Sequence, residues 1–310
     1  MGRILVIRGG ALGDFILTLP VFAALRAQFP DAQVEVLGYP HIARLCLTGG
    51  LAHAVHPIEA RALARFFARG GSLDPNIASF FAGFAVIVSF LYDPDRIFQD
   101  NVALCSKAQF IVGPHRPDEK ASLHAADTFL TALQRLAIFD ADTTPRLAAE
   151  PSAPGPGRWI AAHPGSGSES KNWPERCWAE LLTRVVDGSD RNILLVGGEA
   201  EGDRLQRLAA ALPESRLRVA RSLPLNTLAG LLRACELFVG HDSGITHLAA
   251  AVGLPCVALW GPSNPALWRP RGNRITLVQD ESGLAGLDTP AVWEVLRSCL
   301  PENPAAPHDL

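Results

Sequence analysis

Residues 3–14 have the sequence RILVIRGGALGD, a short apolar run that leads through three glycines to an acidic residue. Arg3–Ile7 is rich in aliphatic and β-branched side chains and is predicted to form a buried strand. From Asp14 to Gln28 apolar residues recur at the spacing of one helix face, so a helix is predicted there. A strand, a glycine turn and a helix are the opening of a βαβ unit, which predicts an α/β fold.

The same alternation of strand and helix continues along the chain and restarts after a linker. Further strands are predicted over residues 33–37, 85–91, 110–112, 159–162, 192–196, 237–239 and 256–260, with helices between them. The linker PSAPGPG, residues 151–157, contains almost nothing that could join a core. We therefore predict two Rossmann-like domains with parallel sheets, residues 1–150 and 151–310, the second ending in a short frayed tail. Ligands bind at the carboxyl ends of parallel strands, so a cleft between the two sheets is expected to hold the site.

The composition argues against several classes of protein. The 310 residues carry a formal net charge of −3, and neither half is rich in Lys and Arg, so no nucleic-acid partner is expected. The six cysteines are scattered without a C-x-x-C pair, which disfavours a zinc site or a disulfide framework and favours a cytoplasmic location. No signal peptide is recognised, and the apolar run over residues 78–91 is shorter than the about 20 residues that cross a bilayer.

Asp14 is the informative residue of the first glycine turn. A carboxylate at a helix N-terminus can act as a general base at the mouth of a cleft, or it can simply cap the helix. The turn has the spacing G-G-x-x-G rather than G-x-G-x-x-G, and Leu37–Tyr39 supplies no acid at the end of the second strand. A dehydrogenase-like dinucleotide-binding protein is therefore the less favoured alternative.

A second polar turn, HPGSGSESKNWP at residues 163–174, also lies between a predicted strand and a predicted helix. Ser166 and Gly167 offer hydroxyl and N–H groups to an anion, and Lys171 adds a positive charge. This combination suits a diphosphate, whereas the alternative is a plain polar loop with a proline at the start of the helix.

The third motif is VGHDSGITHLAAAVGLP, residues 239–255. Ser243 and Gly244 stand at the start of a predicted helix, where small residues let a phosphate approach the first N–H groups. Asp242 is expected either to cap that helix or to hold nearby N–H groups in place, and His247 lies one turn further on the same face, as a ligand contact or a core residue. A serine hydrolase is disfavoured, because no histidine can lie in a relay between two adjacent residues and no G-x-S-x-G turn is present.

In this order the three motifs, with a fourth at residues 260–265 (WGPSNP), resemble glycosyltransferase family 9, whose best-known members are ADP-heptose:lipopolysaccharide heptosyltransferases. The resemblance implies a GT-B architecture, in which two Rossmann-like domains face a central cleft. It also implies inversion at the anomeric carbon, no metal or other cofactor, and transfer of a sugar from an ADP-sugar such as ADP-heptose to a hydroxyl group of a glycolipid acceptor on the lipopolysaccharide core.

Carried over residue by residue, the resemblance makes Asp14 the catalytic base and Glu201 an acid that holds the donor's ribose. The donor-binding residues that it implies are Gly13, Ser166, Gly167, Lys171, Glu201, Asp242, Ser243, Gly244 and His247. The segment SFLYDPD at residues 89–95 departs from the short polar turn usual in the family, which leaves the acceptor pocket undefined.

Three further hypotheses concern binding without catalysis, a metal and a membrane. A non-catalytic sugar-nucleotide-binding module would keep the donor residues and not need Asp14. The D-P-D sequence at 93–95 resembles a metal-binding D-x-D motif, although its proline favours a plain turn. Arg61, Arg65 and Arg69 recur every four residues, so an α-helix would carry them on one side and could rest on the inner membrane. The favoured alternative is a helix whose apolar side packs on the first sheet.

Overall fold

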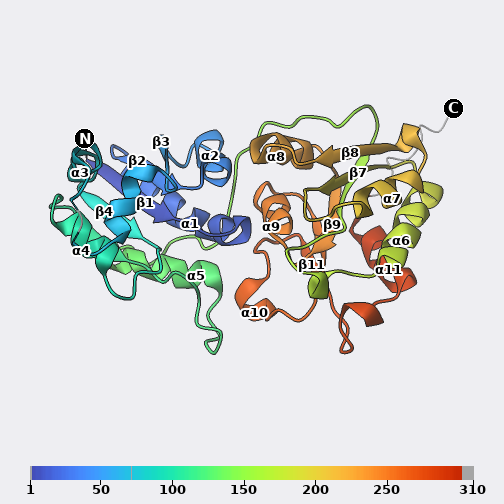
Figure 1. The fold of residues 1–310 in the computed structure, drawn as a ribbon. Helices are drawn as coiled ribbons and strands as arrows, with labels where there is room; N and C mark the ends of the chain where they lie inside the picture. Colours follow the sequence, from blue (N-terminus) through green and yellow to red (C-terminus); the bar gives the residue numbers. More distant parts are fainter. Residues whose placement is uncertain (1, 71, 302–310) are drawn as a thin grey trace. The chain divides into compact units, whose positions relative to one another are not determined.

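The computed structural model describes residues 2–70 and 72–301 of the chain, so the predicted frayed tail, from residue 302 on, lies outside the described residues. The chain forms two compact units. The first unit holds the residues up to Ala149 together with Ala266–Arg271, and the second holds Glu150–Pro265 and the described residues from Gly272 on. Each unit is built on one parallel sheet with helices packed against it, as Figure 1 shows, which confirms the predicted α/β fold with two Rossmann-like sheets.

The sheet of the first unit has the strand order β3-β2-β1-β4-β5, and every neighbouring pair is parallel. Its strands are β1 (Arg3–Arg8), β2 (Gln33–Gly38), β3 (Ala54–Pro57), β4 (Val86–Ser89) and β5 (Gln109–Val112). Its helices are α1 (Leu12–Gln28), α2 (Pro40–Thr48), α3 (Pro75–Ala82), α4 (Ile97–Ala103) and α5 (Ala125–Leu130), with 3-10 helices η1 (Arg61–Phe67) and η2 (Thr131–Leu136). The direction of strand order reverses between β1 and β4, at the point where sheets of this kind bind ligands.

The sheet of the second unit has the order β11-β10-β9-β6-β7-β8, again all parallel. Its strands are β6 (Trp159–His163), β7 (Asn192–Gly197), β8 (Leu217–Arg221), β9 (Leu237–His241), β10 (Cys256–Leu259) and β11 (Ile275–Val278). Counted from β6, this is the 3-2-1-4-5-6 order of dinucleotide-binding sheets, with the reversal between β6 and β9.

Helices cover both faces of the second sheet. They are α6 (Glu175–Gly188), α7 (Arg204–Ala210), α8 (Leu225–Arg233), α9 (Gly244–Ala251) and α11 (Thr289–Cys299), with 3-10 helices η3 (Glu169–Lys171), η4 (Glu214–Arg216) and η5 (Leu284–Gly286). Figure 1 shows α6, α7 and α11 together on one face and α8 beside α9 on the other. A short helix, α10 (Pro265–Trp268), begins where the chain passes into Ala266–Arg271. Burial on both faces explains why β6, β7, β9 and β10 are almost wholly apolar.

Three strands were not predicted, and all three lie at a sheet edge. The side chains of β3 and β11 are only half-buried, and those of β8 are mostly exposed, so none of them has the continuous apolar run of a central strand. The helix predicted over residues 122–138 begins at Ala125 and changes to a 3-10 helix at Thr131. All six cysteines are free thiols.

The prediction that an α-helix over residues 61–69 carries Arg61, Arg65 and Arg69 on one side was wrong. The segment is a 3-10 helix that ends at Phe67, and with three residues per turn Arg61 and Arg65 do not share a side. Arg69 lies beyond the helix and contacts Asp95 at 3.5 Å. Leu63 and Phe66 of this helix are buried in the core of the first unit, as the favoured alternative predicted, whereas Phe67 is exposed. Within residues 2–70 and 72–301, no helix has the length and apolarity needed to span a membrane.

Candidate functional site

The carboxyl ends of β6 and β9 bring the second and third motifs together. The two strands pair directly, with His163 opposite Gly240, so the loops that follow them start side by side. Residues 164–174, here named the donor loop after the role that the resemblance implies, follow β6, and Asp242 and Ser243 follow β9 before α9 begins at Gly244. The two loops meet where the strand order of the sheet reverses, and parallel sheets bind ligands at such points.

Lys171 and Asp242 form the closest contact between the two motifs. The ammonium Nζ of Lys171 lies 2.6 Å from Oδ2 of Asp242. The Asp242 side chain is 10% exposed and that of Lys171 is 34% exposed, so the pair is partly shielded from water. This ion pair holds the ammonium group of Lys171 at the carboxyl edge of the sheet, beside the start of α9.

The start of α9 is capped by Ser243 and not by Asp242, which corrects one of the two roles proposed for that aspartate. The Ser243 hydroxyl accepts a hydrogen bond from the N–H of Thr246 at 3.3 Å. The backbone N–H of His247 bonds to the Ser243 carbonyl, and the His247 residue is 5% exposed. Gly244 is the first residue of the helix, where N–H groups without an intrahelical acceptor carry the positive end of the helix dipole.

Glu201 lies on the turn after β7 and is buried. One carboxylate oxygen accepts the Gly198 N–H at 2.5 Å, and the other lies 3.5 Å from Nε2 of His163. Burial by itself would raise the pKa of Glu201, but the contacts with His163 and the Gly198 N–H outweigh it and lower the pKa to about 2. The structure therefore holds an anionic carboxylate at this edge of the sheet, and its contact with a ribose stays a prediction.

His163 also links Glu201 to the third motif. Its Nδ1 lies 3.3 Å from the Ser243 hydroxyl, so serine, histidine and glutamate form a row. Such a row resembles the relay of a serine hydrolase, with His163 in the place of the histidine. The Ser243 hydroxyl is nevertheless occupied as the cap of α9 and also lies 3.1 Å from the Thr246 hydroxyl, a structural position rather than that of an exposed nucleophile.

The donor loop is shaped by its own small residues. The Ser166 hydroxyl lies 2.7 Å from the Ser168 carbonyl and 2.9 Å from Oδ1 of Asn172, which closes the loop on itself. Gly167 is exposed, and a Cβ there would meet no atom within 4 Å. At Gly165, in contrast, a Cβ would lie 2.0 Å from Oε1 of Glu201, so only glycine fits beside the buried carboxylate.

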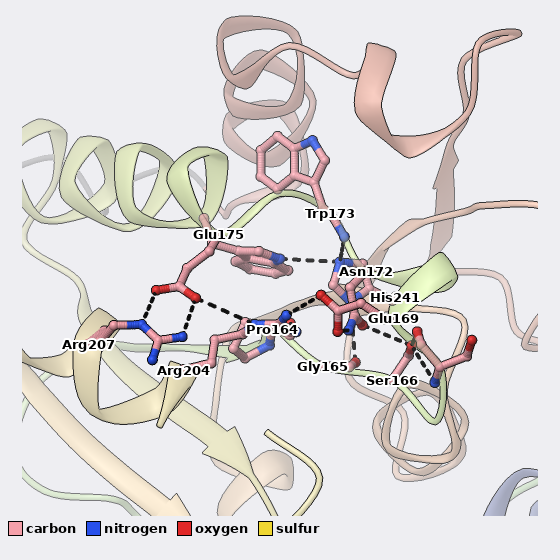
Figure 2. Close-up of polar contacts among 12 residues, drawn as sticks. Pro164, Gly165, Ser166, Glu169, Asn172, Trp173, Glu175, Arg204, Arg207 and His241 are labelled. Atoms are coloured by element: carbon pink, nitrogen blue, oxygen red, sulfur yellow. Dashed lines mark hydrogen bonds and ion pairs between the residues drawn. The ribbon is translucent and has the colours of Figure 1, made fainter. Parts of the chain in front are cut away.

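Arg204, from the start of α7, holds the outer side of the donor loop, and sequence reasoning missed it. Its guanidinium donates to the Pro164 carbonyl at 3.4 Å and to Glu169 at 2.6 Å, and it approaches Glu175 at 3.8 Å. Figure 2 shows these contacts together with the bidentate pair between Arg207 and Glu175. The loop is thus tied to the helix that follows β7.

The first unit holds Asp14 and Gly13, both in the first turn of α1. The helix is preceded by Ala11, and no side chain caps it, so Asp14 is not the N-cap residue. The Asp14 side chain is 28% exposed, and its Oδ1 lies 3.7 Å from the guanidinium of Arg8. Gly10 turns the chain at a φ of +103°, a conformation that favours glycine, immediately before this turn.

Arg8 is a buried cation that the sequence analysis did not single out. Its side chain is 2% exposed, donates to the His115 carbonyl at 2.9 Å and lies 4.4 Å above the ring of Phe129. Burial lowers the pKa of Arg8 to about 10, and the charge of Asp14 opposes that shift. The guanidinium stays charged at neutral pH and stands directly behind the candidate base.

One signal in the sequence could have identified three residues that were missed. Arg8, His163 and His241 are each the last residue of a strand whose other residues are almost entirely apolar and buried. A polar side chain that closes such a strand lies at the ligand-binding edge of a parallel sheet.

The D-P-D segment forms a turn that starts a helix. The carboxylate of Asp93 accepts the N–H groups of Phe98 and Gln99 at 3.2 and 3.0 Å, at the start of α4. Among the residues that the structure describes, no group of three His, Cys, Asp or Glu side chains could hold a metal ion. The same segment borders a cavity of about 650 Å³ inside the first unit, whose polar lining includes Ser89, Asp93, Arg96, Gln99, Gln134 and Arg135.

Comparison with known proteins gives one family. The model of glycosyltransferase family 9 (heptosyltransferase) matches residues 118–287, more than half of the chain. Lipopolysaccharide heptosyltransferase 1 of Escherichia coli strain K12 is 31% identical over 131 residues, which are 42% of this chain and 40% of that protein. The chain therefore spans about two fifths of the length of this curated relative.

Solved structures share the fold over nearly the whole chain. The glycosyl transferase family 9 protein from Veillonella parvula DSM 2008 superposes with a TM-score of 0.74 at 18% identity and covers 96% of this chain and 97% of that chain. The E. coli heptosyltransferase WaaC with ADP gives a TM-score of 0.73 at 19% identity and covers 96% and 99%. At these identities the likeness establishes the fold.

Proposed function

The chain belongs to glycosyltransferase family 9, and from this premise we propose that it transfers a sugar from an ADP-sugar to a hydroxyl group of a glycolipid acceptor. The observation that carries the proposal is the pairing of Lys171 with Asp242 beside the N-terminus of α9. The relatives named above suggest ADP-heptose as the donor and the lipopolysaccharide core as the acceptor.

The second unit is proposed to bind the donor. The diphosphate would approach Lys171 and the first N–H groups of α9, next to the small residues Ser243 and Gly244. Gly167, which has open space above its backbone, lets a phosphate come close to the donor loop. Glu201 would accept hydrogen bonds from the ribose hydroxyls. Lys171 and the N–H groups of α9 supply positive charge to the leaving ADP without a metal ion, because fixed dipoles and a lysine stabilise the charge that develops there.

The first unit is proposed to activate the acceptor. Asp14 takes the proton of the acceptor hydroxyl as the oxygen attacks the anomeric carbon. The bond from that carbon to the diphosphate breaks on the opposite side, so the configuration inverts and ADP leaves with the electron pair. The buried guanidinium of Arg8 lies 3.7 Å from Oδ1 of this carboxylate. The polar cavity bordered by Asp93 suits the hydroxyl-rich part of the acceptor.

Two alternative functions would use parts of the same candidate site. A non-catalytic sugar-nucleotide-binding module would use the second unit alone, and the partly exposed carboxylate of Asp14 beside a buried cation is the feature that argues against it. A dehydrogenase-like protein would bind a dinucleotide in the first unit. Strand β2 ends at Gly38 and α2 follows after Tyr39, so no carboxylate stands where such proteins bind the ribose.

A ligand panel followed by a turnover assay tests the proposal. Thermal shifts with ADP, UDP, GDP, CDP and NAD should be largest for ADP, and ADP release from ADP-heptose should require a lipopolysaccharide acceptor and continue in EDTA. A larger shift with NAD would favour the dehydrogenase. ADP binding without any transfer would favour the binding module. Activity that EDTA abolishes and Mg²⁺ or Mn²⁺ restores would contradict the metal-free mechanism.

A further inference from the structure

His241 is the last residue of β9 and is fully buried. Both nitrogens of its ring have hydrogen-bond partners. Its Nε2 lies 2.9 Å from the backbone N–H of Trp173 and 3.2 Å from the indole N–H of Trp178. Its Nδ1 lies 3.2 Å from the carbonyl of Gly165. Figure 2 shows the imidazole between Gly165 and Trp173, which are at opposite ends of the donor loop.

These partners define one form of the ring. Two N–H donors point at Nε2, so that nitrogen must accept, and the proton must sit on Nδ1 and be donated to the Gly165 carbonyl. Burial lowers the pKa of His241 to about 3, which keeps the ring neutral at ordinary pH. The indole of Trp178 also packs edge-on against the ring, with centroids 5.3 Å apart and planes at 89°.

The two ends of the donor loop are therefore joined through a single side chain. Between them lie Ser166, which closes the loop on itself, and Lys171, which pairs with the neighbour of His241, Asp242. The consecutive residues His241 and Asp242 thus hold the loop at its two ends and at its charged residue.

We infer that His241 is a positioning residue, which fixes the donor loop in the shape that binds the diphosphate of the donor. The identity of the ligand in this inference rests on the proposed function, whereas the hydrogen bonds of His241 to the loop do not depend on it. Nothing in the sequence pattern of the three motifs assigns such a role, since the bonds of His241 join residues 68 and 76 positions away. Loss of the ring should loosen the loop first and weaken phosphate binding as a consequence.

Two conservative variants separate the two ends of the loop. The amide nitrogen of asparagine in His241→Asn can replace Nδ1 and keep the bond to Gly165, whereas the amide oxygen of glutamine in His241→Gln can replace Nε2 and keep the bond to Trp173. Hydrogen exchange on the free protein should therefore show the Trp173 amide exchanging at least about tenfold faster in His241→Asn and nearly unchanged in His241→Gln. Calorimetry should show ADP binding about tenfold more weakly in both variants.

His124→Asn serves as the matched control, because His124 is also a buried histidine bonded to a backbone carbonyl, that of Arg269, but lies in the first unit. It should lower the melting temperature and leave ADP affinity and donor-loop exchange unchanged. Unchanged Trp173 exchange and unchanged ADP affinity in His241→Asn would overturn the inference. Fast exchange of the Trp173 amide in the wild-type protein would also overturn it, even if neither variant folds. Failure of wild-type protein to bind ADP would count against the proposed function, while the exchange pattern would still decide the role of His241.

Discussion

The ammonium group of Lys171 lies 2.6 Å from the carboxylate of Asp242, although 71 positions separate the two residues in the chain. One comes from the loop after β6 and the other from the turn after β9, so their pairing depends on the reversal of strand order between those strands. The pair places a lysine whose charge is partly balanced beside a helix N-terminus. A diphosphate bound there would lose its contacts with water and gain a contact with the ammonium group of Lys171, whose position the fold has already set.

Replacement of Lys171 by methionine keeps the length of the side chain and removes its charge. We expect ADP to bind about tenfold to a hundredfold more weakly, since a charged hydrogen bond contributes about 1.5–3 kcal/mol. Asp242→Asn should weaken binding less, because the ammonium group remains. Isothermal titration with ADP at two salt concentrations measures both effects. Lys107→Met, at an exposed lysine of the first unit, is the control, and equal ADP affinity for wild type and Lys171→Met would exclude a phosphate contact.

Replacement of Asp14 by asparagine keeps the shape of the side chain and removes its capacity to accept a proton. Sugar transfer should fall by about a hundredfold or more, the usual contribution of a general base. ADP affinity should not change, because the residues proposed to bind the donor, except Gly13, lie in the second unit. The control is Asp31→Asn, an exposed acid in the same unit. Near-normal turnover by Asp14→Asn would remove this residue from the mechanism.

Acid should destabilise the fold partly through His241. Its pKa is about 3 in the folded protein and 6.5 ordinarily, so between these values only the unfolded chain takes up the proton. The stability that this residue contributes is complete above about pH 6.5 and is lost as the pH falls toward 3, by up to about 1.4 kcal/mol per pH unit. Glu201, whose pKa is lowered from 4.5 to about 2, adds a second loss only below about pH 4.5.

Between pH 4.5 and 6.5, therefore, the stability of the fold depends on the protonation of buried histidines and not on that of Glu201. Burial also lowers the pKa of His124, so the wild-type protein alone does not separate the two. Urea unfolding at several pH values in this interval should show a smaller slope of unfolding free energy against pH for His241→Gln than for wild type. Identical slopes would mean that His241 does not stay neutral in the folded protein.

The sequence predicted the central strands and indicated the position of the candidate site for the same physical reason. Strands buried on both faces need continuous apolar runs, as in β6 and β9, and the polar turns that follow them must meet at one edge of the sheet. The edge strand β8 exposes most of its side chains and gave no such signal. The roles of His241 and Arg204 could not be predicted, because they depend on partners from other elements whose approach only the packed sheet determines.

The turn at residues 89–95, where the sequence departs from the usual family pattern, yields the last prediction. It borders the cavity of about 650 Å³ in the first unit, whose lining includes Arg96 and Arg135. Two arginines among hydroxyl and amide side chains suit an acceptor saccharide that carries a phosphate or carboxylate. With both arginines changed to glutamine, the KM for a lipopolysaccharide acceptor should rise about tenfold, while kcat and ADP affinity change little.

Asp93 should be left intact in that experiment, because its carboxylate accepts the first N–H groups of α4 and its loss would disturb the cavity wall. Arg44→Gln, at an exposed arginine on α2, is the matched control for a general loss of positive charge. Initial rates at varied acceptor concentration separate KM from kcat. An equal rise in KM for the control would point to nonspecific attraction of an anionic lipid. An unchanged KM in the double variant would mean that the acceptor binds elsewhere in the first unit and that the unusual turn serves only to start α4.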